Sequence, residues 1–436
     1  MRKLSYSRII AIGFIVMILI GTALLMLPVA SRSGQWTSFS DAFFTAVSAQ
    51  CVTGLVVVDT ATYWSLFGQI VILLLIQTGG LGFISIGVFF TIMLRRKLTL
   101  SQRSLFQESM NTLEMSGTAV FTKKIMLWVF IIESIGAVIL TFCFARTMPF
   151  LKALYYGVFH SVSAFCNAGF STLEGNLINY SGDYVLNITV MALVTIGGLG
   201  FIVWDDVYKN KHHFRKYRLH TKIVLILTFV ITFIGALLLF VSEQSTVLYG
   251  MSLPEAITAS FFNSVTSRTA GFNTVDLGNL SEGGKAIMMV IMFIGGSPGS
   301  TAGGVKTTTI MVIVAFLIAN FRHTEPHLFG KRFESDAVKK ATAVMSTNLI
   351  LIVCATVALT IMSGFAIGDV LYETVSAMST VGVTIGITDK FSLAGRYILT
   401  ALMYLGRIGS LTFAVSFLEK KKKVSIGYLP ESISIG

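Results

Sequence analysis

The stretch Ser48-Ala-Gln-Cys-Val-Thr-Gly54 ends a short amphipathic segment, and an apolar segment of membrane-spanning length follows it. Three related stretches occur later in the chain: Ser163-Ala-Phe-Cys-Asn-Ala-Gly169, Val265-Thr-Ser-Arg-Thr-Ala-Gly271 and Ser376-Ala-Met-Ser-Thr-Val-Gly382. We interpret them as four copies of a unit that consists of a helix, a pore loop and a second helix. Four such loops around one axis can replace the water shell of a cation with backbone carbonyl oxygens.

The composition is that of a membrane protein. Charged residues make up 12% of the 436 residues, hydrophobic residues make up 54%, and the mean hydropathy is +0.78. Uncharged runs such as 9–30, 184–204 and 223–242 are long enough to cross a bilayer. The sequence therefore predicts an all-α integral membrane protein with eight spans and four re-entrant pore helices, and it argues against a large soluble core.

The positive charge follows the topology of a multi-pass protein. The net charge is +12, and most of the 33 lysines and arginines lie in five patches: before residue 9, and at 95–124, 209–222, 322–340 and 420–423. This distribution fits the excess of Lys and Arg in cytoplasmic loops rather than a nucleic-acid partner. We expect both termini to be cytoplasmic and the four glycine turns to open on the other side. The first apolar run is too long for a typical signal peptide and is interpreted as a retained span.

A second glycine motif follows each turn at nearly constant distance, which defines four tandem repeats. The motifs start at Gly79, Gly197, Gly295 and Gly406, and the predicted repeats are 1–97, 98–210, 211–325 and 326–436. We expect the first helices at about 9–30, 124–145, 222–242 and 341–363, and the second helices at about 66–94, 184–208, 285–320 and 395–418. The pore helices between them are expected at about 40–51, 151–166, 253–267 and 368–379. Of the second helices, only the third is expected to be broken.

Charges at the ends of the pore helices favour a cation at the turns. Asp41, Glu255 and Asp369 lie near three predicted N-termini, where acids are favourable, and Ser252 has capping-box spacing from Glu255. The C-terminal ends, which carry partial negative charge, then point toward the turns. The second repeat has Lys152 at this place instead of an acid.

The turns themselves supply the candidate ion-binding backbone. Glycine allows dihedral angles that bring carbonyls into a channel, although single glycines in membranes more often serve helix packing. The candidate residues are Val52, Thr53, Gly54, Asn167, Ala168, Gly169, Thr269, Ala270, Gly271, Thr380, Val381 and Gly382. Five residues after three of the glycines come Asp59, Glu174 and Asp276. These acids either form an outer ring that concentrates cations or are ordinary solvated loop residues.

The second helix of the third repeat contains a polar, glycine-rich interruption at 295–306. It is not a nucleotide-binding P-loop, because Val305 stands where glycine belongs before Lys306. Irregular backbone at membrane depth is tolerated where it lines a cavity, so we interpret the loop as a gate, with a kinked helix as the alternative. The gate residues are Gly295, Gly296, Ser297, Gly299, Ser300, Thr301, Ala302, Gly303, Gly304 and Arg407.

Three charged residues inside apolar segments have separate interpretations. Arg407, in the matching place of the fourth repeat, is expected to hydrogen-bond to loop carbonyls, which have little other packing. Lys306 is expected nearer the cytoplasmic end. Glu133 is expected either to pair at a helix interface or to relay protons. No catalytic constellation occurs, so we expect no enzyme and no cofactor in this chain.

The residues at the turns resemble those of the Trk/Ktr/HKT superfamily of potassium transporters, most of all the bacterial Ktr membrane subunit (KtrB-type). The resemblance rests on Cys51-Val-Thr-Gly-Leu55, Asn167-Ala-Gly-Phe-Ser171, Arg268-Thr-Ala-Gly-Phe-Asn273 and Thr380-Val-Gly382. It implies a homodimer on a cytosolic ring of nucleotide-binding RCK subunits (KtrA/KtrC-type), with loop 295–306 as gate and Arg407 opposite it. In that family a serine at the first glycine position accompanies sodium transport, so Gly54 favours potassium.

Together these features predict potassium uptake across the bacterial inner membrane. The membrane potential would drive the ion inward with about 2.3 kcal/mol per charge per 100 mV. A sodium-selective or sodium-coupled transporter of the same fold is the first alternative. A membrane protein without transport activity and a proton-coupled carrier are the others, although a carrier usually has inverted repeats.

Overall fold

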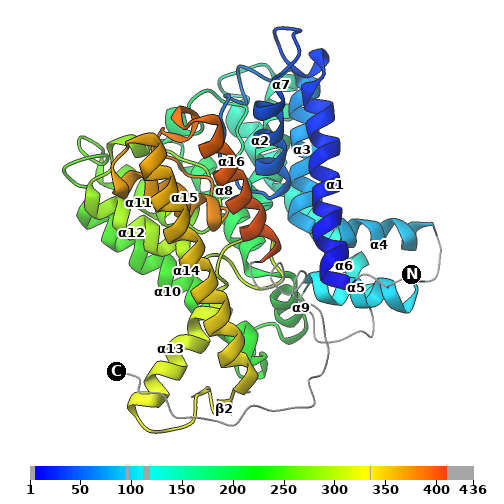
Figure 1. The fold of residues 1–436 in the computed structure, drawn as a ribbon, viewed down its shortest axis with the longest axis vertical. Helices are drawn as coiled ribbons and strands as arrows, with labels where there is room; N and C mark the ends of the chain where they lie inside the picture. Colours follow the sequence, from blue (N-terminus) through cyan, green and yellow to red (C-terminus); the bar gives the residue numbers. More distant parts are fainter. Residues whose placement is uncertain (1–4, 95–97, 111–117, 334, 410–436) are drawn as a thin grey trace.

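The computed structural model describes the chain except for residues 1–4, 95–97, 111–117, 334 and 410–436. The predicted basic patch at 420–423 and the end of the fourth second-helix lie outside the described residues. The regular secondary structure of the described part is almost entirely helical (Figure 1). Its short elements are the hairpin β1 (His327–Leu328) and β2 (Lys331–Arg332), and the 3₁₀ turns Pro28–Ala30, Ile178–Tyr180, Phe214–Lys216, Leu277–Asn279 and Thr388–Lys390.

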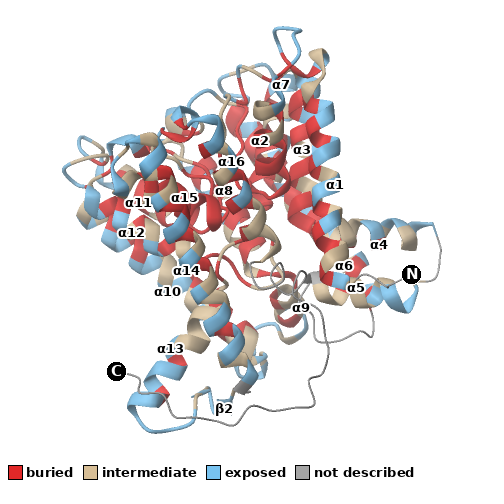
Figure 2. Ribbon diagram, viewed as in Figure 1, coloured by how far each residue is buried: buried red, intermediate tan, exposed pale blue. Residues whose placement is uncertain are grey.

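Four long apolar helices open the four repeats. They are α1 (Tyr6–Met26), α6 (Thr118–Phe144), α10 (Leu219–Ser242) and α14 (Ser335–Ser363). Their outward faces expose large apolar side chains such as Ile15, Phe130 and Phe229. In a membrane these faces contact lipid, which is why Figure 2 shows exposed and buried stripes along the same helix. The prediction of an all-α integral membrane protein is confirmed.

Four short helices lie between the long ones, close to the predicted bounds. They are α2 (Phe39–Gln50), α7 (Phe150–Phe165), α11 (Leu253–Thr266) and α15 (Ile367–Met378). Each is too short to cross a bilayer and ends in the interior at one of the glycine turns. The predicted capping box at Ser252 is wrong: its side chain makes no cap bond. Ser38 caps α2 instead, accepting from the amide of Asp41 at 3.1 Å.

In the first and second repeats the second helix is bent by about a right angle, which corrects the prediction of unbroken spans at 66–94 and 184–208. The pair α3 (Leu66–Leu81) and α4 (Phe83–Met93) bends by 90°, and the pair α8 (Tyr184–Leu199) and α9 (Phe201–Asn210) bends by 94°. Gly82 and Gly200, between the helices, have φ of 76° and 96°, a conformation that L side chains rarely adopt. The second glycine motif thus marks a bend in these repeats.

The second helices of the third and fourth repeats also differ from a single unbroken span. In the third repeat α12 (Glu282–Phe293) and α13 (Thr307–Phe321) flank the predicted loop, and in the fourth α16 (Leu393–Ile408) ends at Gly409. Among the described residues, four single helices could cross a membrane, or six with the bent pairs. The two remaining predicted spans correspond to α12–loop–α13 and to α16. The helices α5 (Leu100–Met110), α9 and α13 lie in the lower half of Figure 1, and α4 projects to the side at about mid-height.

The first glycine of the second motif has a packing role in three repeats. A Cβ on Gly79 would lie 2.0 Å from the Gln50 carbonyl oxygen, and one on Gly197 would lie 2.0 Å from that of Phe165. A Cβ on Gly406 would lie 1.9 Å from the Met378 carbonyl oxygen. In these three repeats the second helix therefore presses directly on the last turn of its own pore helix. In the third repeat Gly295 instead lies against Gly303 and Gly304 of its own loop.

Candidate functional site

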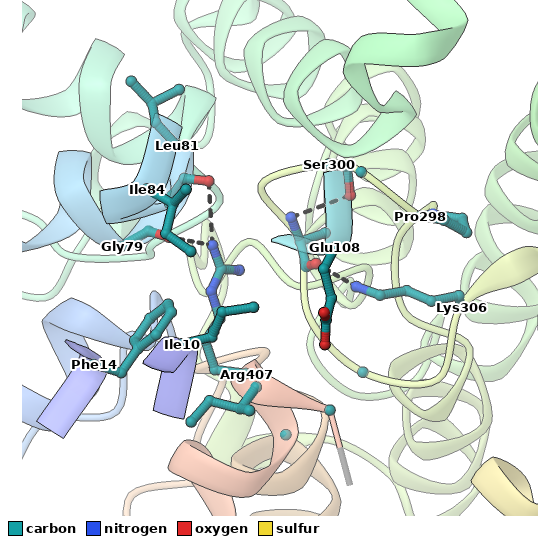
Figure 3. A pocket seen from close by; sticks show the side chains of 18 of the residues that line it. Ile10, Phe14, Gly79, Leu81, Ile84, Glu108, Pro298, Ser300, Lys306 and Arg407 are labelled. Atoms are coloured by element: carbon teal, nitrogen blue, oxygen red, sulfur yellow. Dashed lines mark hydrogen bonds between the residues drawn. The ribbon is translucent and has the colours of Figure 1, made fainter. Parts of the chain in front are cut away.

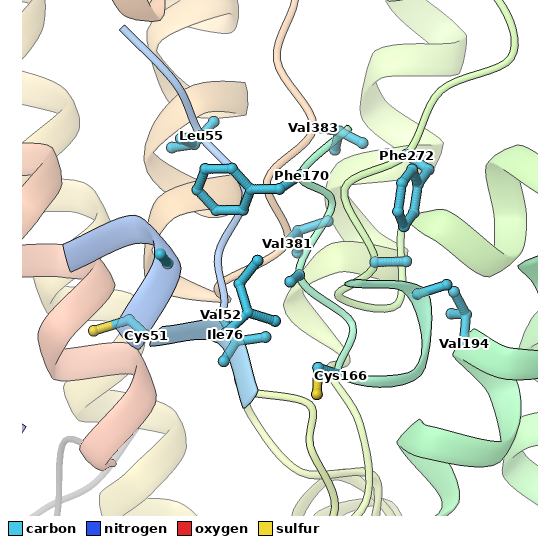
Figure 4. Close-up of a cluster of buried hydrophobic side chains, with 14 of the residues drawn as sticks. Cys51, Val52, Leu55, Ile76, Cys166, Phe170, Val194, Phe272, Val381 and Val383 are labelled. Atoms are coloured by element: carbon cyan, nitrogen blue, oxygen red, sulfur yellow. The ribbon is translucent and has the colours of Figure 1, made fainter. Parts of the chain in front are cut away.

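The four glycine turns meet in a closed ring at the centre of the molecule, where Figure 4 shows side chains from all four around them. Each glycine lies against the turn of the next repeat, so closely that an added Cβ would clash. That Cβ would lie 2.5 Å from the Ala168 oxygen for Gly54, 2.5 Å from Gly271 Cα for Gly169, 2.9 Å from the Val381 oxygen for Gly271, and 1.9 Å from the Thr53 oxygen for Gly382. The order around the ring is therefore the order along the chain, and the fourth turn closes on the first.

All four turns share one unusual backbone conformation. Two residues before each glycine, φ is positive at a residue other than glycine: 58° at Val52, 61° at Asn167, 71° at Thr269 and 52° at Thr380. The glycines also have positive φ, from 70° to 97°, and the residue between does not. Each of the four residues other than glycine in this conformation strains the backbone by about 1–2 kcal/mol, and the surrounding contacts must hold it in place.

The amide groups of the turns are bonded away from the ring. Backbone N–H groups at the middle position donate to the pore helix behind: Thr53 to Ser48 at 2.8 Å, Ala168 to Ser163 at 2.8 Å, Ala270 to Thr266 at 2.9 Å and Val381 to Ser376 at 2.8 Å. Within the described part of the chain, the carbonyls of these four middle residues accept no hydrogen bond. At the middle residue of each turn the backbone N–H is hydrogen-bonded and the carbonyl oxygen is free. Free carbonyl oxygens around one axis are the arrangement that coordinates a dehydrated cation.

Hydroxyl groups behind the turns fix their exit strands, a feature that the sequence analysis missed. Ser48 Oγ accepts from the Gly54 amide at 3.0 Å, and Ser163 Oγ donates to the Phe170 carbonyl at 2.8 Å. In the other two repeats Thr266 donates to the Phe272 carbonyl and Ser376 to that of Val383. The signal was present as a serine six residues before three of the four glycines.

The loop of the third repeat lies directly under this ring. A bridge between Ile294 and Val305 closes its base, and Ser297, Thr301 and Ala302 are buried. A Cβ on Gly303 would lie 1.9 Å from Thr380 Oγ1, so the loop touches the fourth turn from below. A cation that leaves the ring on this side meets the loop.

The loop is anchored to the bend of the second repeat, so the expectation that little packing holds it is wrong. The Ser297 amide donates to the Gly198 carbonyl at 3.1 Å, and the Thr301 amide donates to the Gly197 carbonyl at 3.3 Å. The Phe201 amide donates to the Gly299 carbonyl at 2.9 Å. The bend supplies these partners because carbonyls at the end of α8 and amides at the start of α9 have no partner within their helices.

Two cationic side chains reach the loop from opposite directions in a cavity of about 410 Å³ (Figure 3). Arg407 donates to the Thr301 carbonyl in the loop and to the Gly79 carbonyl in the first repeat; it also donates to the Gly80 carbonyl, at 3.2 Å. Arg407 thus connects three repeats. Lys306 Nζ donates to the Ala302 carbonyl at 2.7 Å, inside the loop itself. Its expected place nearer the cytoplasmic end stays a prediction, and the structure shows that it lines this cavity.

The remaining predicted residues lie apart from the ring. Asp59 and Asp276 are exposed and accept hydrogen bonds from amides in their own turns, at 2.8 and 3.0 Å. Glu174 is exposed beside a separate outer cavity of about 440 Å³. Glu133 accepts from Gln77 Nε2 at 3.1 Å, which joins α6 to α3. The outer acidic ring, the filter and the gate stay predictions as functional assignments.

Known proteins resemble this chain over most of its length. It is 40% identical to the Ktr system potassium uptake protein B of Bacillus subtilis, over 98% of this chain and 96% of that protein. It is 38% identical to the potassium/sodium uptake protein NtpJ of Enterococcus hirae, over 100% and 98% of the two chains. The potassium transporter TrkH of Vibrio parahaemolyticus shares the fold with a TM-score of 0.75 at 19% identity, over 96% of this chain and 86% of that chain.

The match to a protein family covers nearly the whole chain as well. Residues 5–426 match TrkH, described as a cation transport protein. The predicted membership of the Trk/Ktr/HKT superfamily is confirmed by this match and by the relatives at 38–40% identity. The chain is therefore a multi-pass membrane protein that belongs to the TrkH family of cation transport proteins.

Proposed function

We propose that the chain takes up potassium ions across the cell membrane, with the ring of four turns as its selectivity filter. The observation that carries this proposal is the closed ring itself, with its free carbonyls at Thr53, Ala168, Ala270 and Val381. Eight or so carbonyl oxygens can replace the hydration shell of a potassium ion. The names of the two relatives, a potassium uptake protein and a potassium/sodium uptake protein, support potassium as a transported ion.

In this proposal the ion enters from the outer side, loses water at the ring and is stopped by loop 295–306 until the loop moves. The C-terminal ends of the four pore helices face the ring and add partial negative charge. The exposed acids Asp59, Glu174 and Asp276 lie on the approach and raise the local cation concentration. The loop closes the path because it touches Thr380 below the ring.

The proposed assembly is a homodimer on a cytosolic, nucleotide-binding RCK ring. No cofactor is proposed for this chain, and the nucleotide would bind the partner. The name of the Bacillus subtilis relative, a Ktr system protein, supports a multi-component transporter. The described basic segments 209–222 and 322–332 lie at the lower end of Figure 1, where such a ring would dock. This places both termini in the bacterial cytoplasm and predicts transport rather than enzymatic activity.

The direct test is potassium uptake by purified protein in vesicles with an imposed inside-negative potential. Potassium should accumulate faster than in vesicles with the variant Gly382→Ala, whose Cβ would lie 1.9 Å from the Thr53 oxygen. Sodium should compete weakly when it is added in excess outside. Uptake no faster than in protein-free vesicles would refute the proposal, and preferred uptake of sodium would favour the sodium-selective alternative.

A further inference from the structure

Two ion pairs on the outer side join pore helices to neighbouring repeats. Arg396 on α16 of the fourth repeat donates to Asp41 on pore helix α2 of the first, at 3.0 Å. Lys285 on α12 of the third repeat binds Asp369 on pore helix α15 of the fourth, at 2.7 Å. In both pairs the acid lies in the first turn of a pore helix, and the base lies on the second helix of the preceding repeat.

At the other two junctions hydrogen bonds replace these ion pairs. Ser181, just before α8 of the second repeat, donates to Glu255 in the first turn of pore helix α11, at 3.0 Å. Tyr155 on pore helix α7 donates its hydroxyl to Gln69 on α3 of the first repeat, at 2.8 Å. We call these four contacts the outer belt. It contains Asp41–Arg396, Gln69–Tyr155, Ser181–Glu255 and Lys285–Asp369.

The outer belt repeats with the symmetry of the ring of turns. Gln69, Lys285 and Arg396 are each the fourth residue of their helices, and each helix has a serine N-cap. Asn187, at the same place in α8, donates to the Ser181 carbonyl at 2.8 Å. The helices that the belt joins also pack on one another: α16 on α2, α3 on α7, α8 on α11 and α12 on α15. The belt therefore follows the same cyclic order as the glycine contacts below it.

The two ion pairs are partly withdrawn from water, which strengthens them. The side chain of Lys285 is 11% exposed and that of Asp369 is 30% exposed, while Arg396 and Asp41 are 23% and 25% exposed. By contrast Arg146, in the pair with Asp183 inside the second repeat, is 64% exposed. Exposed pairs contribute little, and partial burial raises the contribution of a close pair.

A pore helix transmits a displacement from the belt to the filter. Each is a rigid rod of 12 to 16 residues, about 18–24 Å long, with a filter turn at one end. The belt residue is the third residue in three of these helices, and Tyr155 is the sixth residue of α7. The turns cannot move closer to one another, because the contacts between their glycines already exclude a methyl group. A change in the tilt of one pore helix must therefore change the width of the ring.

We propose that the outer belt positions the four turns and thereby sets how sharply the ring discriminates cations by size. The inference rests on the proposed function, in which the ring is the filter. Its residues are positioning residues: they contact pore helices and not the ion. Specificity at the ring is then determined in part by four contacts at the far ends of the pore helices, which join each repeat to the next.

The test compares the permeabilities of purified variants to potassium, rubidium, sodium and caesium in vesicles. Lys285→Met and Asp369→Asn should each lower the potassium-to-sodium ratio by about fivefold or more. The double variant should be no worse than Lys285→Met alone, because Lys285→Met already removes the contact to Asp369 together with the pair to the exposed Glu282 of its own helix, at 2.9 Å. The variant Asp369→Glu, which keeps the pair, should retain most of the ratio. Arg146→Met is the matched control, since it breaks a pair within one repeat and should leave the ratio unchanged.

Two outcomes overturn the inference. One is a wild-type permeability series both in folded Lys285→Met and in Ser181→Ala, the milder variant, which loses a single hydrogen bond to Glu255. The other is an equal shift in the control Arg146→Met. If the wild type itself fails to prefer potassium over sodium, the proposed function fails instead. The inference is still decided in that case, because the belt variants either change the permeability series or leave it as it is.

Discussion

Replacing Arg407 with alanine should release the loop below the filter. The arginine makes one hydrogen bond to the loop, at the Thr301 carbonyl, and its other bonds go to Gly79 and Gly80 in the first repeat. The three backbone bonds that tie the loop to the second repeat remain in the variant. A hydrogen bond from a charged group contributes about 1.5–3 kcal/mol, so the open-to-closed ratio should rise roughly 10- to 100-fold.

The assay is potassium flux into vesicles that contain matched amounts of folded protein. If the wild type is mostly closed, Arg407→Ala should carry more flux and depend less on its regulatory partner. Lys306→Met is the matched control. Lys306 is a second basic residue in the lining of the same cavity, but its hydrogen bonds stay within the loop, at Ala302 and Gly303. It should therefore raise flux much less.

The comparison distinguishes two ways in which Arg407 could keep the path closed. One is a latch, by which we mean hydrogen bonds that hold the loop in place, and the other is electrostatic repulsion of the cation. If the positive charge under the ring were all that mattered, both variants would raise flux alike, and Arg407→Lys would behave as wild type. If the latch matters, Arg407→Lys should be partly open, since an ammonium group cannot reach carbonyls on both sides in the way a guanidinium fork does. Wild-type flux and intact regulation in Arg407→Ala would refute this reasoning.

Three further predictions follow from other contacts. Gly54→Ser should lower the potassium-to-sodium permeability ratio, because its Cβ would lie 2.5 Å from the neighbouring Ala168 oxygen; an unchanged ratio would contradict the filter assignment. Burial raises the pKa of Glu243, but hydrogen bonds from Ser281, Thr246 and Ser242 lower it to a value below that of an ordinary glutamate. Its stabilising effect should therefore be lost as pH falls through the pKa of the folded protein, and a Tm series should show a weaker acid dependence in Glu243→Gln. The chain alone should respond little to ATP or ADP, and full nucleotide switching of the purified chain would count against the proposed RCK partner.

The helices and turns were predictable because their signals are local. The pore helices follow from short amphipathic segments that end in glycine, and the third break follows from Pro298 and its polar neighbours. The bends at Gly82 and Gly200 were missed for a physical reason. Glycine permits a positive φ but does not require it, and many glycines in membrane helices serve packing alone.

The contacts that hold the site were harder to predict because they join distant parts of the chain. Arg407 was expected to reach the loop, yet its bonds to the first repeat depend on the ring closing between repeats four and one. The pair Asp41–Arg396 depends on the same closure. Asp41 and Asp369 were predicted only as favourable charges at helix N-termini. Their partners become apparent once the cyclic order of the repeats is known.

The central claim is that potassium is held by backbone oxygens of the four turns. Crystals of the protein soaked with rubidium, a potassium substitute with a strong anomalous signal, test it most directly. We predict anomalous density on the axis of the ring, within contact distance of the carbonyls of Thr53, Ala168, Ala270 and Val381. Rubidium bound only outside the ring, for example beside Asp59, with none between these carbonyls, would contradict the account.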